Sequence, residues 1–394
     1  MKIVFLSHTH RGSIFKVGSS HLARELEKMG HEILFISTPI SFLTIGKSLI
    51  SSNKNRLFEL KQKLRLIRGR RENKEINIVD YIPFTFFPYT KLPLSDSLFT
   101  AKHAAGITYP SIKHTLKKND FLEVDLVLMD DPTLVFMKKY IKTNVWVYRM
   151  TDIYSEMPNT QKSISDVEGY ISRFTDEFIA TSKPVADKFE EKWGKTATVF
   201  ENGVDYNHFQ GDYNLPTEFD PTDTFRAIYI GSLDKRFNWD ILIDSAKKLP
   251  AVKFYIIGPN DSVEEDNLPL NIRLLGSKPY ETIPAYLAFS NVGLLPLING
   301  NSNTGRSPMK LYEYGAAGLP VVATKTVELE RRNLQFVYLA DDVDEFTNHI
   351  QDAINQKELI SNNAKEISLQ MSWGNITKNM VSWLKDKKDY SRNF

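Results

Sequence analysis

The stretch that decides the fold is Arg306-Ser-Pro-Met-Lys-Leu-Tyr-Glu-Tyr-Gly-Ala-Ala-Gly-Leu-Pro-Val-Val-Ala-Thr324, which runs from a basic, polar loop through a short helix into an apolar strand. Pro308 suits the first position of a helix, because its missing N–H has no helical partner to lose. The free N–H groups at the start of such a helix attract an anion, as does its positive end. Lys310 adds a full charge at the same place. The stretch therefore predicts an anion site at a helix start.

The rest of this stretch adds a sugar-binding group and a turn. Glu313 lies near the same helix face as Lys310 and can accept two hydrogen bonds from a ribose diol. Gly315 and Gly318 are expected to let the backbone turn into the strand at residues 319–324. Together these features indicate a site for a nucleotide-diphosphate sugar. The alternative is an ordinary loop, helix and strand with a solvent-exposed Lys and Glu.

Length and composition limit the class of protein. The 394 residues exceed what one hydrophobic core usually supports, so two domains of roughly 200 residues are expected. The net charge of +2 gives no general signal for binding polyanions, and the absence of cysteine excludes disulfides and thiolate metal sites. The N-terminal apolar run is too short for a signal peptide, and no segment offers about 20 uninterrupted apolar residues. We expect a soluble or peripheral protein in the cytoplasm.

Apolar runs of strand length alternate with amphipathic stretches along most of the chain, which predicts an α/β fold with parallel sheets covered by helices. A first sheet is expected from strands at residues 3–7, 32–37, 124–129, 145–149, 178–181 and 198–200, with a helix near 19–29. A second sheet is expected from residues 225–232, 253–257, 272–275, 292–297 and 321–323, with a helix at 239–248.

Gly, Asp, Pro and Thr accumulate between residues 208 and 222, which indicates a domain boundary there. The predicted domains are residues 1–208 and residues 209–372. A last amphipathic stretch near 373–385 has no strand after it, and the C-terminal residues 373–394 are assigned to the first domain.

Polar residues that follow strands are the candidates for chemistry, because ligands in open α/β sheets bind at the carboxyl ends of the strands. A small residue at Gly231 allows a phosphate to approach the backbone, with Ser232 and either Lys235 or Arg236 as donors. Asp152 follows the expected strand at 145–149. The alternative for each glycine is a plain turn.

Several motifs in this order resemble those of GT-B glycosyltransferases. They include Glu201-Asn-Gly-Val-Asp205, Gly231-Ser-Leu233, Pro308-Met-Lys-Leu-Tyr-Glu313 and Gly318-Leu-Pro-Val-Val322. The resemblance covers residues 200–325 well and the N-terminal half loosely. Within that class the chain looks most like the membrane-associated glucuronosyltransferase of xanthan assembly, with teichuronic-acid glycosyltransferases of bacilli as near relatives.

The resemblance implies a GT-B fold, in which two Rossmann-like, doubly wound parallel-sheet domains face a cleft and the C-terminal helix crosses back to the first domain. The first domain would bind the acceptor and the second the UDP-sugar. Carried over by position, the resemblance makes Asp152 the base and Lys310 the pyrophosphate contact, with Met309 beside it. It makes Glu313 the ribose contact and places the edge of the uracil at Lys278 and Tyr280.

Asp152 also has support from the chemistry of transfer. An inverting displacement needs a carboxylate that takes the proton of the acceptor hydroxyl as the sugar carbon is attacked. Asp152 lies after an apolar strand, near Arg149, where it could do so. The alternatives are a turn or capping aspartate, or a base supplied by His8 or His10 in the same expected cleft.

One departure from the family pattern bears on stereochemistry. Retaining relatives place a second glutamate eight residues before the position of Glu313, and here that position is Gly305. The sequence therefore favours inversion. Arg306 is a candidate to hold a sugar carboxylate, as are Arg11 and Lys16, which makes glucuronate the first donor sugar to consider.

No metal and no cofactor besides the donor substrate are expected. Lys310, the helix start and Gly231-Ser232 can stabilise the leaving group without a metal ion. Asp130-Asp131 is a paired acidic step after a strand, but it lacks the Asp-x-Asp spacing of metal-dependent transferases, and no cluster of His or Cys completes a metal site.

A basic stretch at residues 54–71 predicts contact with an anionic membrane. It interleaves eight Lys and Arg with apolar residues at helical intervals, against the single acidic Glu59. Aromatic residues at 81–89 are expected in the headgroup zone or along a lipid path. The alternative is a solvated helix and a buried aromatic loop. Nucleic acid is disfavoured, because no stacking motif accompanies the charge.

These patterns together predict an inverting glycosyltransferase, peripheral on the inner face of the cell membrane. It would move a sugar, with glucuronic acid as a candidate, from UDP to a lipid-linked intermediate of a cell-surface polysaccharide or teichuronic acid. Two alternatives remain: a UDP-sugar 2-epimerase of the same fold, and a non-catalytic membrane scaffold that binds nucleotide sugars.

Overall fold

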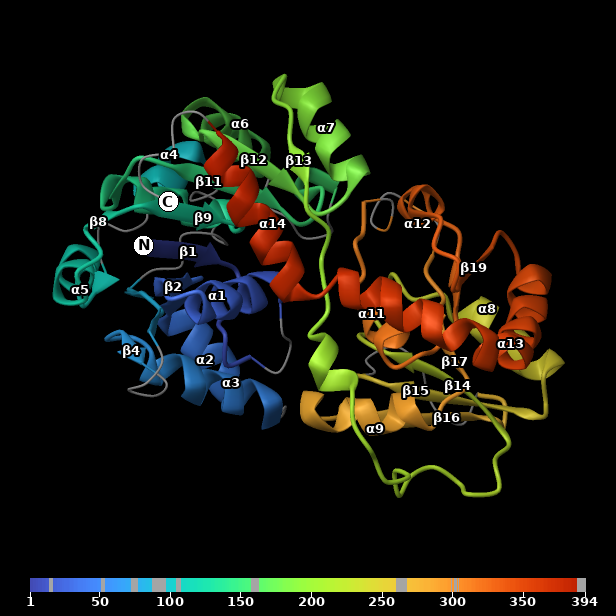
Figure 1. The fold of residues 1–394 in the computed structure, drawn as a ribbon. Coiled ribbons are helices and arrows are strands. Elements are labelled where there is room, and N and C mark those ends of the chain that lie inside the picture. The colour runs from blue at the N-terminus through green and yellow to red at the C-terminus, as the bar shows by residue number, and fades with distance from the viewer. Residues whose placement is uncertain are drawn as a thin grey trace. The chain divides into compact units, whose positions relative to one another are not determined.

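The computed structural model describes residues 1–13, 17–50, 54–71, 77–86, 97–103, 108–156, 163–259, 268–298, 300, 303 and 305–387. The chain divides into two compact units. Unit 1 comprises Met1–Glu201 together with the residues from Thr377 onward, and unit 2 comprises Asn202–Ile376. Figure 1 shows the elements of both units.

Unit 1 is built on an eight-stranded sheet with the order β13-β12-β11-β9-β1-β2-β5-β4. Its neighbouring strands are parallel except for β4 and β5. The strands are β1 (Lys2–Ser7), β2 (Glu32–Ser37), β4 (Arg70–Arg71), β5 (Ile78–Tyr81), β9 (Leu126–Met129), β11 (Trp146–Met150), β12 (Glu177–Ala180) and β13 (Thr198–Val199). A small three-stranded sheet has the order β3 (Ile40–Ser41), β6 (Phe84–Thr85), β7 (Thr108–Tyr109), and β8 (Glu123–Val124) pairs with β10 (Lys142–Thr143).

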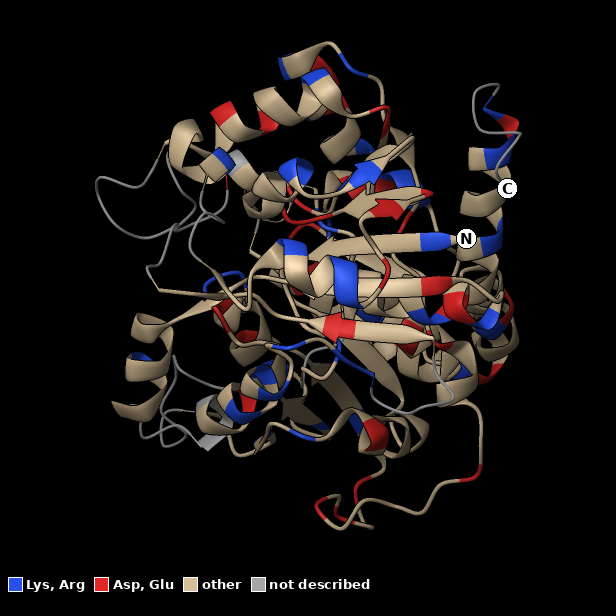
Figure 2. Cartoon of the chain, turned by 90° about the vertical axis from the view of Figure 1, so that its left-hand side faces the viewer, with Lys and Arg blue, Asp and Glu red and all other residues tan. Residues whose placement is uncertain are grey.

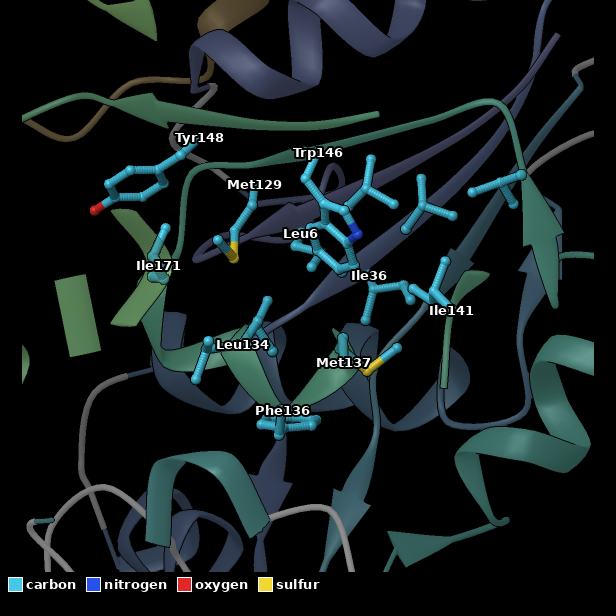
Figure 3. Close-up of a cluster of buried hydrophobic side chains, with 14 of the residues drawn as sticks. Leu6, Ile36, Met129, Leu134, Phe136, Met137, Ile141, Trp146, Tyr148 and Ile171 are labelled. Carbon is cyan, nitrogen blue, oxygen red and sulfur yellow. The ribbon is translucent and has the colours of Figure 1, made fainter. Parts of the chain in front are cut away.

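The helices of unit 1 cover both faces of this sheet, and β1 and β2 are correspondingly apolar at almost every position. Figure 3 shows the core on one face, where Leu6, Met129 and Trp146 from the strands meet Leu134 and Ile171. The helices are α1 (Gly18–Lys28), α2 (Phe42–Ile50), α3 (Lys54–Arg65), α4 (Leu98–His103), α5 (Ile112–Lys118), η2 (Pro132–Lys139), η3 (Tyr154–Glu156), α6 (Ile164–Phe174) and α7 (Lys183–Trp193).

Unit 2 is built on a six-stranded parallel sheet with the order β16-β15-β14-β17-β18-β19. Alternate residues of its strands enter two cores, one on each face. The strands are β14 (Phe225–Ile230), β15 (Val252–Ile257), β16 (Ile272–Gly276), β17 (Val292–Leu295), β18 (Val321–Thr324) and β19 (Val337–Ala340). The helices are η4 (Tyr206–Phe209), α8 (Trp239–Lys248), η6 (Tyr280–Thr282), α9 (Ile283–Ala288), α11 (Met309–Ala316), α12 (Val327–Arg332) and α13 (Val343–Gln370).

The last helix, α14 (Trp373–Asp386), begins in unit 2 and continues in unit 1. Within unit 1, Trp383 packs edge-on against Phe200, and the Lys387 ammonium pairs with Glu177 at 3.0 Å.

The division between the units falls earlier than the predicted boundary at residues 208–222. The chain after β13 already packs within unit 2, because Gly203 lies against Met371 and Ile376 so closely that a Cβ atom would approach both at 2.6 Å. Val204 pairs with Ser372 in an isolated β-bridge.

The turn from α11 into β18 is closed by hydrogen bonds from Gly318 N–H to the Gly315 carbonyl (2.9 Å) and from Leu319 N–H to the Tyr314 carbonyl (2.9 Å). Gly318 has φ +75°, a conformation that favours glycine, and it ends the helix as predicted. The expectation for Gly315 was wrong. Gly315 lies inside α11, where a Cβ would come within 2.3 Å of the Ser368 hydroxyl on α13, so its small size permits helix packing rather than a turn.

Pro308 also differs from its expected role. It caps α11 in an extended conformation (φ −73°, ψ 117°), and the first helical residue is Met309.

The fold class predicted from the alternating pattern is confirmed, but the basic segment is not one helix. Its helix, α3, ends at Arg65, and Gly69 with φ +70° turns the chain so that β4 pairs antiparallel with β5. Tyr81 is buried in β5 and is not available to a headgroup zone, because this strand lies inside the sheet. Residues 87–89 of the aromatic stretch lie outside the described residues.

Candidate functional site

Three glycines end adjacent strands of the unit 2 sheet and bring their backbones close together. Gly231 N–H donates to the Ile257 carbonyl (2.8 Å), and Gly258 N–H donates to the Gly276 carbonyl (2.9 Å). A Cβ on Gly258 would lie 1.7 Å from the Gly231 carbonyl oxygen, so no larger residue fits there. These strand ends therefore carry no side chain that would stand between the backbone and a ligand at the carboxyl end of the sheet.

Lys310, on the first turn of α11, reaches the backbone of Gly231. A Cβ at Gly231 would meet Cε of Lys310 at 2.4 Å and its Nζ at 2.8 Å. Within the described part of the chain the ammonium makes no hydrogen bond or ion pair. Burial, followed by repulsion from Arg306, lowers the pKa of Lys310 to about 8. Such a site gains most from an anion that supplies the missing partner.

Two arginines lie in the electrostatic neighbourhood of Lys310. Arg236 is held by its near neighbour Asp234 through two side-chain hydrogen bonds, from Nε at 3.0 Å and from one terminal nitrogen at 2.6 Å. The hydrogen bonds from Arg236 lower the pKa of Asp234 to about 2, and Arg306 contributes to the same shift. Arg306, Arg236 and Lys310 thus bring three positive charges to one region, together with the carboxylates of Asp234 and Glu313.

Glu313 lies one turn further along α11, and its carboxylate makes no hydrogen bond or ion pair with the described residues. Burial raises the pKa of Glu313, and the charge of Lys310 opposes that rise. A carboxylate with unused acceptor capacity beside an anion site is suited to a pair of hydroxyl donors.

The loop that carries Ser307 into α11 is braced by a buried network that the sequence did not indicate. Arg332 donates to the Ser307 hydroxyl at 2.7 Å and to Glu328 at 2.9 Å, and Asn202 donates through its backbone and side chain to Ser307. Burial alone would raise the pKa of Glu328, but hydrogen bonds and charge from Arg331 and Arg332 lower it overall. The Glu-x-x-Arg-Arg spacing on one helix was the available signal.

The remaining predicted donor residues differ in their surroundings. Met309 and Ser232 are partly exposed, Ser232 accepts a hydrogen bond from Tyr229 through its carbonyl, and Lys235 is exposed. Lys278 pairs with Glu218, which raises the pKa of that lysine. Tyr280 stacks on His208 with ring centroids 4.3 Å apart. The structure thus gathers Gly231, Arg236, Arg306, Lys310 and Glu313, whereas Lys278 and Tyr280 have separate partners beyond β16.

Asp152 lies in unit 1, two residues beyond the end of β11, and is partly exposed. It lines a pocket with an empty volume of about 280 Å³ that includes space open to solvent. Tyr154, Glu168, Lys188 and Trp193 also line this pocket. Glu168 accepts a hydrogen bond from the buried Tyr148 hydroxyl at 3.0 Å, and burial raises the pKa of Glu168.

A second polar cluster in unit 1 surrounds Asp130, at the point where the strand order reverses between β1 and β9. Asp130 is almost fully buried, and burial raises its pKa. Its carboxylate accepts hydrogen bonds from Ser7 and Ser19. Nδ1 of His8 lies 4.0 Å away, and Arg149 lies 3.9 Å away. The sequence presented Asp130 only as half of an acidic pair, and its packing could not be foreseen.

The surroundings of His10 and Arg11, in the loop after β1, do not favour the roles predicted for them as a base and as a contact to a sugar carboxylate. His10 is buried, with Nε2 3.4 Å from Glu59, so it is not exposed as a base. Arg11 forms a two-pronged pair with Asp80 at 2.8 and 2.7 Å and is engaged within unit 1. Lys16 lies outside the described residues.

Among the described residues no group of three or more His, Cys, Asp or Glu is arranged to hold a metal ion. In the same part of the chain, no helix combines the length and the apolar character that crossing a bilayer requires.

Comparison with known proteins shows what the chain is similar to. Residues 224–356 match the family described as "Glycosyl transferases group 1". TuaH of Bacillus subtilis (strain 168), a protein assigned as a glycosyltransferase of teichuronic acid biosynthesis, is 26% identical over 191 residues. That match spans 45% of this chain and about half (47%) of the length of TuaH.

Solved structures extend the likeness to the whole fold. Sucrose-phosphate synthase from Thermosynechococcus elongatus superposes with a TM-score of 0.69 at 14% identity, covering 97% of this chain and 98% of that chain. Anabaena HepE in complex with UDP superposes with a TM-score of 0.63 at 16% identity, covering 98% of this chain and 100% of that chain. The predicted resemblance to GT-B glycosyltransferases is confirmed. Residues 224–356 thus match the glycosyl transferases group 1 model, and the chain as a whole has the GT-B fold.

Proposed function

We propose that the chain is an inverting glycosyltransferase that moves a sugar from a UDP-sugar to a lipid-linked intermediate of a cell-surface polysaccharide or teichuronic acid. The proposal rests on the surroundings of Lys310 at the start of α11. Its ammonium lies against the backbone of Gly231 and has no carboxylate partner among the described residues. The relatives support the choice of donor. Anabaena HepE was solved with UDP, with UDP and glucose, and with UDP-glucose.

In this proposal unit 2 binds the donor. Lys310, Arg236 and Arg306 neutralise the pyrophosphate, and the backbone N–H groups at Gly231, Ser232 and the start of α11 add hydrogen bonds. Glu313 accepts from the ribose hydroxyls, and the edge of the uracil lies at Lys278 and Tyr280. These contacts stabilise the UDP that departs and require no metal ion.

Unit 1 supplies the base. As the acceptor oxygen bonds to the anomeric carbon, the bond from that carbon to UDP breaks, and the acceptor proton passes to the Asp152 carboxylate. Attack from the face opposite the leaving group inverts the configuration of the sugar. Gly305, at the position where retaining relatives carry a glutamate, is consistent with this single displacement.

Glucuronic acid is the proposed donor sugar, with Arg306 as the residue that pairs with its carboxylate. The basic residues of segment 54–71 hold the protein at the inner face of the cell membrane, where lipid-linked acceptors are found. A calorimetric titration with UDP, UDP-glucose and UDP-glucuronate tests the donor. Tighter binding of UDP-glucuronate is expected, and equal affinity for the two sugars would reject the carboxylate contact.

Replacing Asp152 with Asn separates an enzyme from a binding scaffold. We expect UDP affinity to persist while transfer falls by about a hundredfold or more, because the amide cannot take the proton. Asp166→Asn, an exposed change on α6 of the same unit, is the control and should leave turnover unchanged. Unchanged turnover in Asp152→Asn would remove Asp152 from the mechanism, and UDP binding without any transfer by the unaltered protein would favour the scaffold.

A further inference from the structure

Helix α2 is apolar and exposed, whereas a helix at a protein surface usually presents polar residues to solvent. None of its residues is buried, and Leu49 and Ile50 are 64% and 89% exposed. Among the described residues, nine of the fifteen exposed large hydrophobic side chains fall between Phe42 and Tyr109. A concentration of this kind marks an interaction surface rather than scattered surface residues.

Helix α3 packs beside α2 and supplies positive charge. Lys61, Lys63 and Arg65 lie on α3, whereas α2 is uncharged apart from Lys47. Figure 2 colours Lys and Arg blue. Phe58 and Leu64 of α3 are exposed and extend the apolar surface of α2. The exposed basic residues on α3 and the chain that follows it are Lys61, Arg65, Arg68, Arg70 and Arg71.

The base of this surface is a cluster of phenylalanines. Phe42, the first residue of α2, meets Phe84 edge-on with ring centroids 5.0 Å apart, and Phe86 lies 5.9 Å from Phe42. These contacts fix the start of α2 on β6, while Leu49 and Ile50 at its other end are exposed. The helix is thus anchored at one end and open at the other.

Glu59 is the single acidic residue between positions 42 and 71, and it faces inward. Its carboxylate accepts a hydrogen bond from the Ser13 hydroxyl at 3.1 Å and lies 3.4 Å from His10. Both partners belong to the loop after β1, which begins at His8 beside Asp130. The exposed face of α2 and α3 is therefore free of carboxylates, and α3 is joined to the loop at the carboxyl end of the unit 1 sheet.

An apolar helix beside a basic one suits a particular partner. A nucleic acid satisfies the charges but leaves the aliphatic side chains of α2 in water, and an apolar protein groove leaves the basic residues without partners. An anionic bilayer meets both needs, because its headgroups pair with Lys and Arg and its acyl boundary accepts Leu, Ile and Phe.

We propose that α2 and α3 together form a docking surface for an anionic lipid bilayer, in which α2 enters the interface and α3 contacts the headgroups. The inference deepens the proposed membrane contact of segment 54–71, on which it rests, by assigning the apolar part to α2. Through Glu59, docking also positions the loop after β1 relative to the lipid surface.

Because the chain has no cysteine, a single thiol can report on α2 directly. We choose Ile50→Cys labelled with a polarity-sensitive fluorophore, with Leu359→Cys as the control, since Leu359 is 81% exposed on α13 of unit 2. With vesicles of phosphatidylcholine and phosphatidylglycerol, the emission at position 50 should shift to the blue and that at 359 should not. No shift at 50, or equal shifts at both positions, would overturn the proposal.

The role of charge is tested by Lys61→Glu/Arg65→Glu/Arg68→Glu, with Lys117→Glu/Lys118→Glu on α5 as a control that also reverses surface charge. Affinity for the same vesicles, measured by sedimentation, should fall about tenfold or more in the α3 variant only. At high salt the affinities of the variant and the unaltered protein should become similar. Equal binding of the unaltered protein to pure phosphatidylcholine vesicles would overturn the electrostatic part.

UDP calorimetry on the same samples keeps the two proposals apart. UDP binding without vesicle binding rejects the docking surface alone, and vesicle binding without UDP binding rejects the proposed function alone.

Discussion

Lys310 illustrates how a charged residue can be held ready for a ligand. Burial, with repulsion from Arg306 and Arg236, lowers its pKa to about 8, well below the ordinary 10.5 of lysine. In the free protein the ammonium is charged below about pH 8 and loses its proton above it. A bound pyrophosphate would restore the charge, since it favours the protonated form.

UDP affinity is therefore expected to depend on pH in one direction. It should be constant below about pH 8 and fall by up to about tenfold per pH unit above it, until the pKa of Lys310 in the complex is reached. Calorimetry from about pH 7 to about pH 9.5 measures this, with Lys310→Met as the control. The control should bind about ten- to a hundredfold more weakly and show no such fall. A parallel decline in both proteins would assign the effect to another group.

Gly231 gives a second test at the residue scale. In Gly231→Ala the new methyl group would occupy the position of the Lys310 side-chain end, which is flexible and can move away. UDP affinity should fall about tenfold or more, and the melting temperature should also fall, because Gly231 has φ +159° and the methyl group would lie 2.8 Å from the Tyr229 hydroxyl. In a Lys310→Met background the same change should have almost no further effect on affinity, because the contact is already lost. Additive losses in the double variant would contradict the contact.

At this scale the sequence predicted which residue types to examine but not all of their partners. Lys310, Glu313 and Gly231 lie where strand ends and a helix start must lie in an α/β unit, so spacing alone brings them together. Arg11 and His10 were equally good candidates for the site from the sequence, because they also follow a strand. Their inward pairing with Asp80 and Glu59 depends on β5 and α3, which are distant in sequence and could not be read from a local pattern.

Among the elements, α12 has an effect on the site that its position in the sequence does not suggest. Its last residue, Arg332, joins buried Glu328 to the Ser307 hydroxyl and so holds the loop that leads into α11. Arg331 donates to the same carboxylate but is exposed. The two arginines form a natural matched pair for substitution.

Arg332→Met should lower the free energy of unfolding by about 3 kcal/mol, since it leaves a buried carboxylate with fewer partners. It should also weaken UDP binding, because the loop before α11 loses its brace. Arg331→Met is the control, expected to be less destabilising and to leave UDP binding unchanged. Urea unfolding and calorimetry on both proteins provide the measurements, and equal UDP affinities in the two variants would show that the brace does not reach the site.

Prediction at the element scale succeeded where periodicity was simple. Strands β1, β2 and β15 and helix α8 follow from apolar runs and an amphipathic stretch, and their bounds are close to those expected. Helix α2 was missed because its exposed face is apolar, so it lacks the polar side that marks a surface helix. The long α13 was missed because its buried residues are sparse along many turns.

For the whole molecule, the proposed chemistry predicts independence from divalent metal. The three cationic side chains of unit 2 supply the charge that a metal ion would otherwise bring to the pyrophosphate. Transfer activity should remain within about twofold after exhaustive treatment with a chelator. A loss of activity that manganese restores would contradict this expectation. Calcium and zinc, added separately, are the controls for a nonspecific effect of divalent ions.

The architecture was predictable from the chain as a whole, because two series of alternating strands and helices permit few other arrangements. The place where the chain passes from one unit to the next was harder. Composition marks residues 208–222, but the transition is decided by Asn202 and Gly203, whose packing against Ser307 and Met371 joins residues far apart in sequence.

The inward orientation of Glu59 has a practical consequence for handling the protein. Since this carboxylate is engaged by Ser13 and His10, it does little to neutralise the basic side chains around it, and dissolved salt has to screen them instead. Their field extends roughly 30 Å at 0.01 M salt and about 8 Å at physiological ionic strength. A chain whose overall charge is only +2 should therefore adhere to a cation-exchange resin at neutral pH and be released by modest salt.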